Sequence, residues 1–200
     1  MRPLDRLGAV ILAAGLSSRM GGEQKLVKLL DGKPLLQHSL DTVAALGLAD
    51  ALAVTGHARA EVEAVIAGSG IRSVFNPDYA TGIGSSLARG VEHLSPAVAG
   101  AFIVLGDMPL VMAEDYWRLA EAFAAEGGER ICRPCHAGRP GHPVLFPKRL
   151  FADLRCLGGD QGGAPVIGRH QDDVILVDVG SPRVLADIDT QADFRSGLVE

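Results

Sequence analysis

A segment rich in small residues and carrying two cations lies near the start of the chain. It covers residues 12–25, with Gly15 among the small residues and Arg19 and Lys25 as the cations. Small side chains let successive backbone N–H groups approach an anion, while an arginine can fork onto phosphate oxygens and a lysine can act as a point charge. This combination is suited to binding a triphosphate.

The same segment differs from two established phosphate-binding motifs. It has neither the G-x-x-x-x-G-K-[ST] pattern of a Walker A loop nor the G-x-G-x-x-G pattern of a dinucleotide site. Residues 12–25 therefore predict another kind of phosphate-binding loop. The alternative is an ordinary strand-to-helix loop with incidental charges.

A carboxylate follows an apolar run later in the chain. Residues 104–109 read Val-Leu-Gly-Asp-Met-Pro, which places Asp107 at the end of an expected strand. Mg²⁺ prefers one or two carboxylates together with phosphate oxygens and water. Asp107 is thus a candidate magnesium ligand, and a helix N-cap or turn is the alternative role for an aspartate in this place.

Two further carboxylates lie near the end of the chain. Asp187 and Asp189 alternate within residues 186–190, so they project from the same side of an extended segment. Either could complete a metal site with Asp107. The alternative is that Asp189 or Thr190 caps a closing helix.

The elements that must position these groups follow from the order of apolar runs. Short β-branched runs predict strands, and apolar residues at three- and four-residue intervals, such as Leu36, Leu40 and Val43, predict helices. The expected strands are residues 8–13, 51–55, 71–75 and 101–105, and the expected helices are residues 35–46, 58–67, 83–94 and 113–125. This alternation predicts a Rossmann-like α/β fold with a mostly parallel sheet, helices on both faces, and ligands beyond the carboxyl ends of the strands.

The rhythm of the sequence changes after residue 125. Residues 133–143 are rich in proline and glycine and separate short apolar stretches at 131–132 and 144–146, which predicts a small strand–loop–strand insertion. A short helix at 147–157, a glycine cluster at 158–163, a strand at 174–179 and a helix at 190–197 complete the expected elements. We expect residues 1–200 to form a single domain, because neither side of these loops could hold an independent core.

The composition excludes several classes of function. The 200 residues carry a formal net charge of −5, which leaves no basic field for binding nucleic acid. The longest apolar run, residues 7–16, is about half of the roughly 20 residues that cross a bilayer, and a buried strand is favoured over an export signal for it. Three cysteines, an odd number, suit a reducing compartment, so we expect a cytoplasmic protein without a membrane partner.

One short motif suggests a cofactor that we do not favour. Cys132, Cys135 and His136 spell C-x-x-C-H, the attachment pattern of c-type haem. That attachment requires export, whereas this motif is solitary and lies between an expected strand and a Gly/Pro loop. A zinc site is not favoured either, because the nearby His142 and Cys156 lack the paired spacing of zinc ligands.

Residues 12–25, 106–109 and 187–190 together resemble the MobA-like nucleotidyltransferases that finish molybdenum cofactor. Three further stretches are similar to the cytidylyltransferase branch of that family: residues 76–79 with Gly82, Ser85, Ser86 and Leu87; residues 138–143; and residues 159–162. The chain has Ala14 where the GTP-using branch usually has a second glycine. It departs from the family at Gly163 and Ala164, where Ala-Arg is common.

The resemblance implies a nucleotide-diphospho-sugar transferase type of fold and a role for each matching residue. The base and ribose would be held by Leu12, Ala13, Ala14 and Gly15, with Gly82 and Ser86 in the same nucleotide site. Arg19 and Lys25 would hold the phosphates and, with Asp107, act in catalysis. Mg²⁺ would be held by Asp107 with Asp187 or Asp189, and the acceptor pocket would be lined by Arg139, His142 and Asp160.

The implied reaction is magnesium-dependent transfer of CMP from CTP to the terminal phosphate of molybdopterin, with release of pyrophosphate. A protein nucleophile is not needed, because a phosphate monoester is largely dianionic at pH 7 and the sequence has no G-x-S-x-G elbow. GTP as donor, a sugar phosphate or polyol phosphate as acceptor, and a non-catalytic molybdopterin carrier are the alternatives. A receiving molybdoenzyme would be a transient partner.

Overall fold

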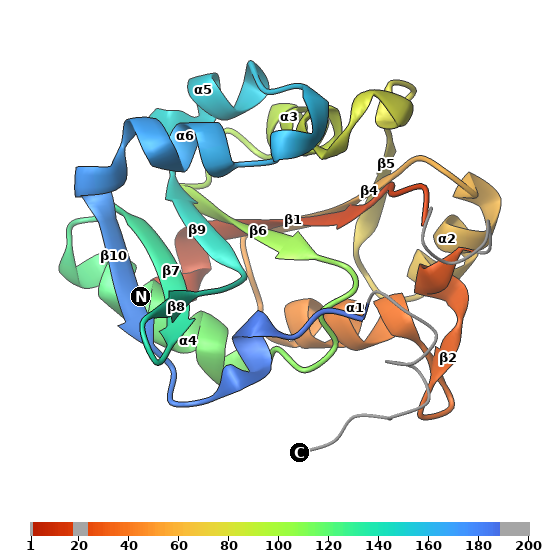
Figure 1. The fold of residues 1–200 in the computed structure, drawn as a ribbon, viewed down its shortest axis with the longest axis horizontal. Coiled ribbons are helices and arrows are strands. Elements are labelled where there is room, and N and C mark those ends of the chain that lie inside the picture. The colour runs from red at the N-terminus through yellow and green to blue at the C-terminus, as the bar shows by residue number, and fades with distance from the viewer. Residues whose placement is uncertain (1, 18–23, 189–200) are drawn as a thin grey trace.

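The computed structural model describes residues 2–17 and 24–188 of the chain. Within these residues, eight strands form one sheet in the order β10-β7-β9-β6-β1-β4-β5, with β8 paired to β7 (Figure 1). The strands are β1 (Leu7–Ala13), β4 (Asp50–Thr55), β5 (Arg72–Phe75), β6 (Gly100–Leu105), β7 (Ile131–His136), β8 (Arg139–Pro140), β9 (Val144–Pro147) and β10 (Val174–Asp178). A separate two-stranded sheet pairs β2 (Leu29–Leu30) with β3 (Lys33–Pro34).

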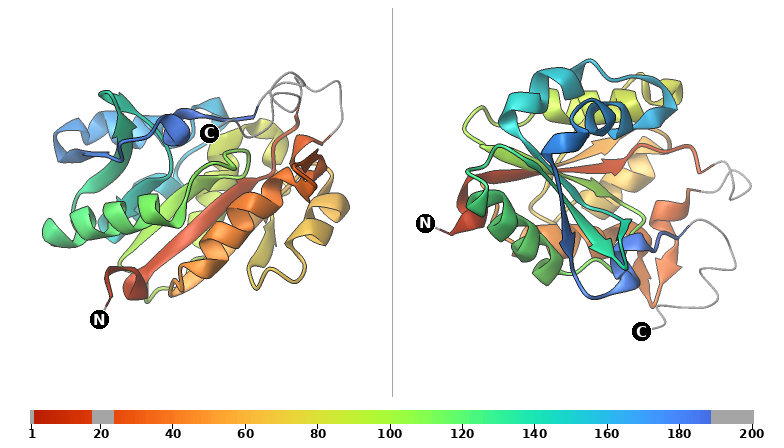
Figure 2. Two further views of the ribbon diagram at one scale, coloured as in Figure 1. Left: turned by 90° about the horizontal axis from the view of Figure 1, so that it is seen from below. Right: turned by 60° about the vertical axis from the view of Figure 1, so that its left-hand side comes forward.

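Helices cover both faces of the main sheet (Figures 1 and 2). One face carries α3 (Ile83–Glu92), α5 (Phe151–Arg155) and α6 (Ala164–Arg169), and the other carries α1 (Leu35–Ala45), α2 (Arg59–Ile66) and α4 (Ala113–Ala125). None of the helices in the described part of the chain is long and apolar enough to cross a membrane.

Strand β1 lies near the middle of the sheet and pairs in parallel with both β4 and β6. All seven of its residues are buried. Its side chains alternate between the two cores: Ala9 and Ile11 pack on the α1 side, whereas Val10 and Leu12 pack on the α3 side. A strand buried on both faces must be continuously apolar, which is why β1 falls within the longest apolar run of the sequence.

The predicted α/β fold with a mostly parallel sheet is confirmed. The four expected strands of the first half differ from β1, β4, β5 and β6 by one residue at an end, and the expected helix at 113–125 coincides with α4. The predicted strand–loop–strand segment is present, but both of its strands belong to the main sheet. Strand β9 runs antiparallel to β6 and β7 and lies between them, while β10 extends the sheet in parallel with β7.

Helix α6 was not predicted from the sequence. It has only six residues, starts with Ala164-Pro165 directly after a glycine cluster, and is too short for helical periodicity to show. The expected helix at 147–157 is divided into the 3₁₀ turn η5 (Lys148–Leu150) and α5. The expected helix at 190–197 lies outside the described residues.

Candidate active site

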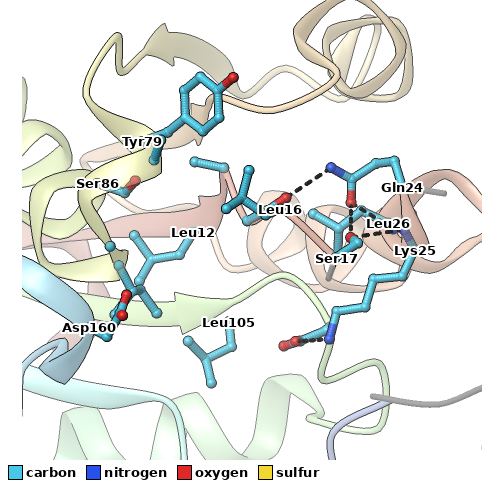
Figure 3. Close-up of a pocket in the computed structure, with 16 residues that line it drawn as sticks. Leu12, Leu16, Ser17, Gln24, Lys25, Leu26, Tyr79, Ser86, Leu105 and Asp160 are labelled. Carbon is cyan, nitrogen blue, oxygen red and sulfur yellow. Dashed lines mark hydrogen bonds and ion pairs between the residues drawn. The ribbon is translucent and has the colours of Figure 1, made fainter. Parts of the chain in front are cut away.

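A cavity of about 560 Å³ opens beyond the carboxyl ends of β1 and β6, and we call it the first cavity. One wall is the connection after β1, which contributes Gly15, Ser17 and Lys25. The opposite wall is the region around the start of α3, with Tyr79, Ser86 and Asp160, and Leu12 and Leu105 lie between the two walls (Figure 3). This is the edge at which a parallel sheet offers its ligand crevice.

The connection after β1 is closed at its base by a buried glutamine. Gln24 donates from Nε2 to the carbonyl oxygen of Gly15 at 3.1 Å, and its Oε1 accepts from the hydroxyl of Ser17 at 2.7 Å. The backbone N–H of Lys25 donates to that same Ser17 oxygen at 3.1 Å. These bonds tie the two ends of the segment together and determine where Lys25 enters the cavity (Figure 3).

Lys25 and Asp107 form an ion pair within the first cavity. Lys25 Nζ lies 2.7 Å from Asp107 Oδ2, and the two side chains are only 14% and 21% exposed. Lys25 Nζ also donates to the carbonyl oxygen of Ile188 at 3.0 Å, and the N–H of Ile188 donates to the Asp107 carbonyl at 3.0 Å. Three distant segments of the chain therefore meet at one partly buried charge pair.

A buried asparagine organises the wall formed by α3. Asn76 follows β5, and its Nδ2 donates to Ser85 Oγ at 2.9 Å and to Ser86 Oγ at 3.0 Å. Its Oδ1 accepts from the N–H of Asp78 at 3.0 Å. Because Ser86 Oγ accepts from Asn76, its own hydrogen can be donated into the first cavity, which Ser86 lines.

Gly82 lies where the start of α3 touches a later loop. Its φ of +121° is a conformation that side chains disfavour, and a Cβ there would overlap the carbonyl group of Gly159 and lie 2.5 Å from Asp160 Oδ1. The absence of a side chain thus lets residues 159–160 approach α3. As a result, Asp160 lines the first cavity.

A second cavity of about 410 Å³ adjoins the first and shares with it the residues Leu12, Ile83, Leu105 and Asp160. Arg133 of β7 and His142 line it. Burial lowers the pKa of His142 to about 4; the nearby charge of Arg133 acts in the same direction and that of Asp107 opposes it. His142 is therefore neutral at pH 7. Burial also lowers the pKa of Arg133.

A third cavity, of about 360 Å³, borders the second through His142 and Leu105. Arg139 and Asp187 line it. Asp187 precedes Ile188, whose N–H is bonded to Asp107, so these two candidate metal ligands lie on segments that touch. No cluster of three or more His, Cys, Asp or Glu side chains suited to a metal occurs within residues 2–17 and 24–188.

The structure brings most of the predicted site residues together around these cavities. The first cavity is lined by Leu12, Ala14, Gly15, Lys25, Gly82, Ser86, Asp107 and Asp160. Ala13 is buried in the core on the α1 side. Arg139 lines the third cavity and neither of the other two. Arg19 and Asp189 lie outside the described residues, so their predicted roles stay predictions.

Three residues of these sites have no role assigned to them by the sequence. Gln24 and Asn76 lie within the motifs at 12–25 and 76–79, but both act by bonding to other groups of the site. The signal for both is a polar amide side chain inside a motif. Arg133 could have been noticed as a charge within a predicted strand–loop boundary.

A family model described as MobA-like NTP transferase domain matches residues 9–174 of the chain. The molybdenum cofactor cytidylyltransferase of Escherichia coli (strain K12) is 31% identical over 199 residues, which cover 96% of this chain and 95% of that protein. The bifunctional protein GlmU of Acidovorax sp. (strain JS42) is 36% identical over 135 residues, or 62% of this chain. Only 27% of that GlmU is matched, so the chain spans about a quarter of its length.

Solved structures resemble the chain over nearly its whole length. A homolog of Mycobacterium tuberculosis Rv0371c from Mycobacterium sp. strain JC1 has a TM-score of 0.85 and 28% identity, with 98% of this chain and 96% of that chain covered. Rv0371c of M. tuberculosis H37Rv in complex with manganese has a TM-score of 0.76 and 25% identity, with 96% and 97% covered.

Proposed function

The chain belongs to the MobA-like NTP transferase family, and from this we propose that it transfers CMP from CTP to the terminal phosphate of molybdopterin. The observation that carries the proposal is the meeting of Lys25, Asp107 and the Gly15 segment in one cavity at the carboxyl ends of β1 and β6. Similarity to a molybdenum cofactor cytidylyltransferase over 96% of the chain supports the choice of donor and acceptor.

Each wall of the first cavity supplies a different part of a nucleotide site. Gly15 offers an open backbone, since nothing lies within 4 Å of the position its Cβ would take. Ser86 presents a hydroxyl that is already oriented by Asn76, and Leu12 and Leu105 supply apolar surface. We propose that the base and ribose bind between these walls, with the phosphates directed to Lys25, and that Arg19 adds a second contact to them.

The donor set suits a hard divalent cation. Asp107 presents a carboxylate to the first cavity, and Asp187 lies on the segment bonded to it through Ile188. Carboxylate oxygens are ligands that Mg²⁺ prefers, and a relative with 25% identity was crystallised with manganese. We propose that Asp107 holds Mg²⁺ with Asp187 or Asp189. When bound, the metal would neutralise charge that develops on the triphosphate.

In the proposed step, an oxygen of the acceptor phosphate attacks the α-phosphorus of CTP in line with the leaving group. A new P–O bond forms, the bond between the α-phosphorus and its bridging oxygen breaks, and the electron pair leaves with pyrophosphate. Lys25, which holds Asp107 in the structure, would exchange that partner for the phosphate oxygens. Positioning and charge neutralisation supply the rate, because the acceptor is already dianionic.

Pyrophosphate release with each of the four triphosphates, Mg²⁺ and molybdopterin tests the proposal. We expect release with CTP, and we expect Asp107→Ala to abolish it while the protein stays folded. Glu121→Ala is the matched control, because Glu121 is an exposed acid of α4. Near-normal turnover by Asp107→Ala would refute the assigned role of Asp107, and a GTP preference would refute the choice of donor. Absence of release with all four triphosphates would indicate a carrier.

A sugar phosphate is the competing acceptor, because curated GlmU proteins match the chain at up to 36% identity. Those matches cover about a quarter to a third of each GlmU. Glucose 1-phosphate in the same assay separates the two acceptors. We expect no pyrophosphate release with it.

A further inference from the structure

Arg133 and His142 line the second cavity and carry polar groups that the described residues leave without a partner. Within residues 2–17 and 24–188, the buried atoms concerned are Nε of Arg133 and Nδ1 of His142. A polar group removed from water without a partner destabilises the protein, and more so when it is charged. The two side chains therefore give this cavity hydrogen-bonding capacity that a bound ligand can use.

The rest of the second cavity is mostly apolar. Its walls include Leu87 of α3, Ile103 of β6, Val144 and Phe146 of β9, and Ile167 of α6. A sugar carries hydroxyl groups around its whole ring and would leave several of them unpaired against these side chains. A flat heterocycle instead places apolar faces against such walls and keeps its polar atoms at the edge.

The two orphaned groups differ in what they can bind. The guanidinium of Arg133 only donates hydrogen bonds, so it requires an acceptor such as a carbonyl oxygen. A neutral imidazole such as His142 can accept a hydrogen bond at one ring nitrogen and donate at the other. A ring lactam presents a carbonyl oxygen next to an N–H group, and this edge complements the pair.

The second cavity also lies where an acceptor must lie. It shares Leu12, Leu105 and Asp160 with the first cavity, which holds the Lys25–Asp107 pair. A ligand whose ring occupies the second cavity can therefore place a terminal phosphate in the first.

We propose that Arg133 is a specificity-determining residue that binds the lactam carbonyl of the acceptor's heterocycle, with its ring in the second cavity. This inference rests on the proposed function, in which the acceptor is a pterin, and it names the residue that distinguishes a pterin from a sugar. Arg139, which lies on the neighbouring strand β8, belongs to the third cavity and has no part in this contact.

The test uses two fluorescent ligands that differ at one group. One is 6-hydroxymethylpterin, which has the lactam, and the other is its 2,4-diamino analogue, in which an amino group replaces the carbonyl. We measure the binding of both by fluorescence quenching, without nucleotide. The wild-type protein should bind the lactam at least tenfold more tightly, and Arg133→Met should bind the two ligands about equally. Arg133→Lys should show an intermediate preference, because lysine keeps the charge without the fork.

Stability and a second arginine provide the controls. Arg133→Met should melt at or above the wild-type temperature, because the change removes a half-buried cation whose Nε has no partner among the described residues. Arg130→Met removes an arginine that directly precedes β7 and does not line the second cavity. Its guanidinium bonds to Glu126 and to the carbonyl oxygen of Asp172, so this variant should keep the tenfold preference.

Several results would overturn the inference. They are a preference that survives in Arg133→Met, an equal loss of both ligands in that variant together with a lowered melting temperature, or a preference that is lost in Arg139→Met instead. Binding here is measured without turnover. If pyrophosphate release fails but the lactam preference depends on Arg133, the proposed transfer reaction is wrong and the binding role of Arg133 stands. If release succeeds and the preference does not depend on Arg133, the proposed reaction stands and the role of Arg133 is wrong.

Discussion

Replacement of Gly82 by alanine should both destabilise the protein and weaken acceptor binding. The backbone at Gly82 has φ +121° and ψ 169°, a region that is essentially restricted to glycine. An added Cβ would also overlap the carbonyl group of Gly159 and lie 2.5 Å from Asp160 Oδ1. The loop that carries Gly159 and Asp160 must then move away from α3.

Two terms contribute to the expected loss of stability. Backbone strain of this kind costs about 2 kcal/mol, and overpacking against a neighbouring backbone costs about 2 kcal/mol more. For a chain of 200 residues, a total of about 4 kcal/mol corresponds to a melting temperature lower by roughly 8–16 °C. Because Asp160 lines both the first and the second cavity, KM for the acceptor should rise as well.

Thermal denaturation followed by circular dichroism, with steady-state pyrophosphate release, measures both effects. Gly127→Ala is the matched control: Gly127 also has a positive φ, of +69°, but nothing lies within 4 Å of its Cβ position. It should lose only about 1 kcal/mol, or roughly 2–4 °C. If Gly82→Ala melts no lower than Gly127→Ala, the close approach of residues 159–160 to α3 is wrong.

Two further predictions concern Lys25 and His142. Lys25→Met should lower kcat about 10²- to 10³-fold, because it removes a cation that acts like an oxyanion-hole donor. Lys25→Arg should keep part of the wild-type rate. An unchanged kcat in Lys25→Met would exclude phosphate binding by Lys25. Burial lowers the pKa of His142 to about 4, so this histidine binds a proton more tightly in the unfolded chain than in the folded one. The free energy of unfolding therefore falls as the pH drops from about 6.5 towards 4, by about 2 kcal/mol at pH 5 relative to pH 8. Urea denaturation at pH 5 and pH 8 should show that the loss of unfolding free energy is smaller in His142→Gln than in the wild type by about 2 kcal/mol. An equal loss in the wild type and the variant would contradict a buried, neutral His142.

The strands and helices of the first half could be predicted because their signals are local. In β1, side chains alternate between two cores and every residue is buried, so the run of apolar residues marks the strand directly. Helix α4 shows its apolar side at three- and four-residue spacing over thirteen residues. Strand-end residues such as Asp107 follow from these boundaries, because parallel strands bring their carboxyl ends to one edge.

The second half could be predicted less well, because its arrangement depends on pairing between distant segments. Strand β9 is inserted antiparallel between β6 and β7, and only the hydrogen bonds of the sheet determine that order. Four residues are too few to carry a directional signal, and a strand of this kind looks the same in either orientation.

The sequence by itself determined the βαβ framework, the edge of the sheet at which we expect ligands, and the residue types available there, because periodicity and strand ends are properties of contiguous residues. Only the tertiary structure decided which of those residues meet. It joined Lys25 to Asp107 and to Ile188, which is 163 positions from Lys25, and it placed Arg133 beside His142 in an apolar cavity. Such contacts depend on chain crossings and packing between segments far apart in sequence, and no local pattern encodes them.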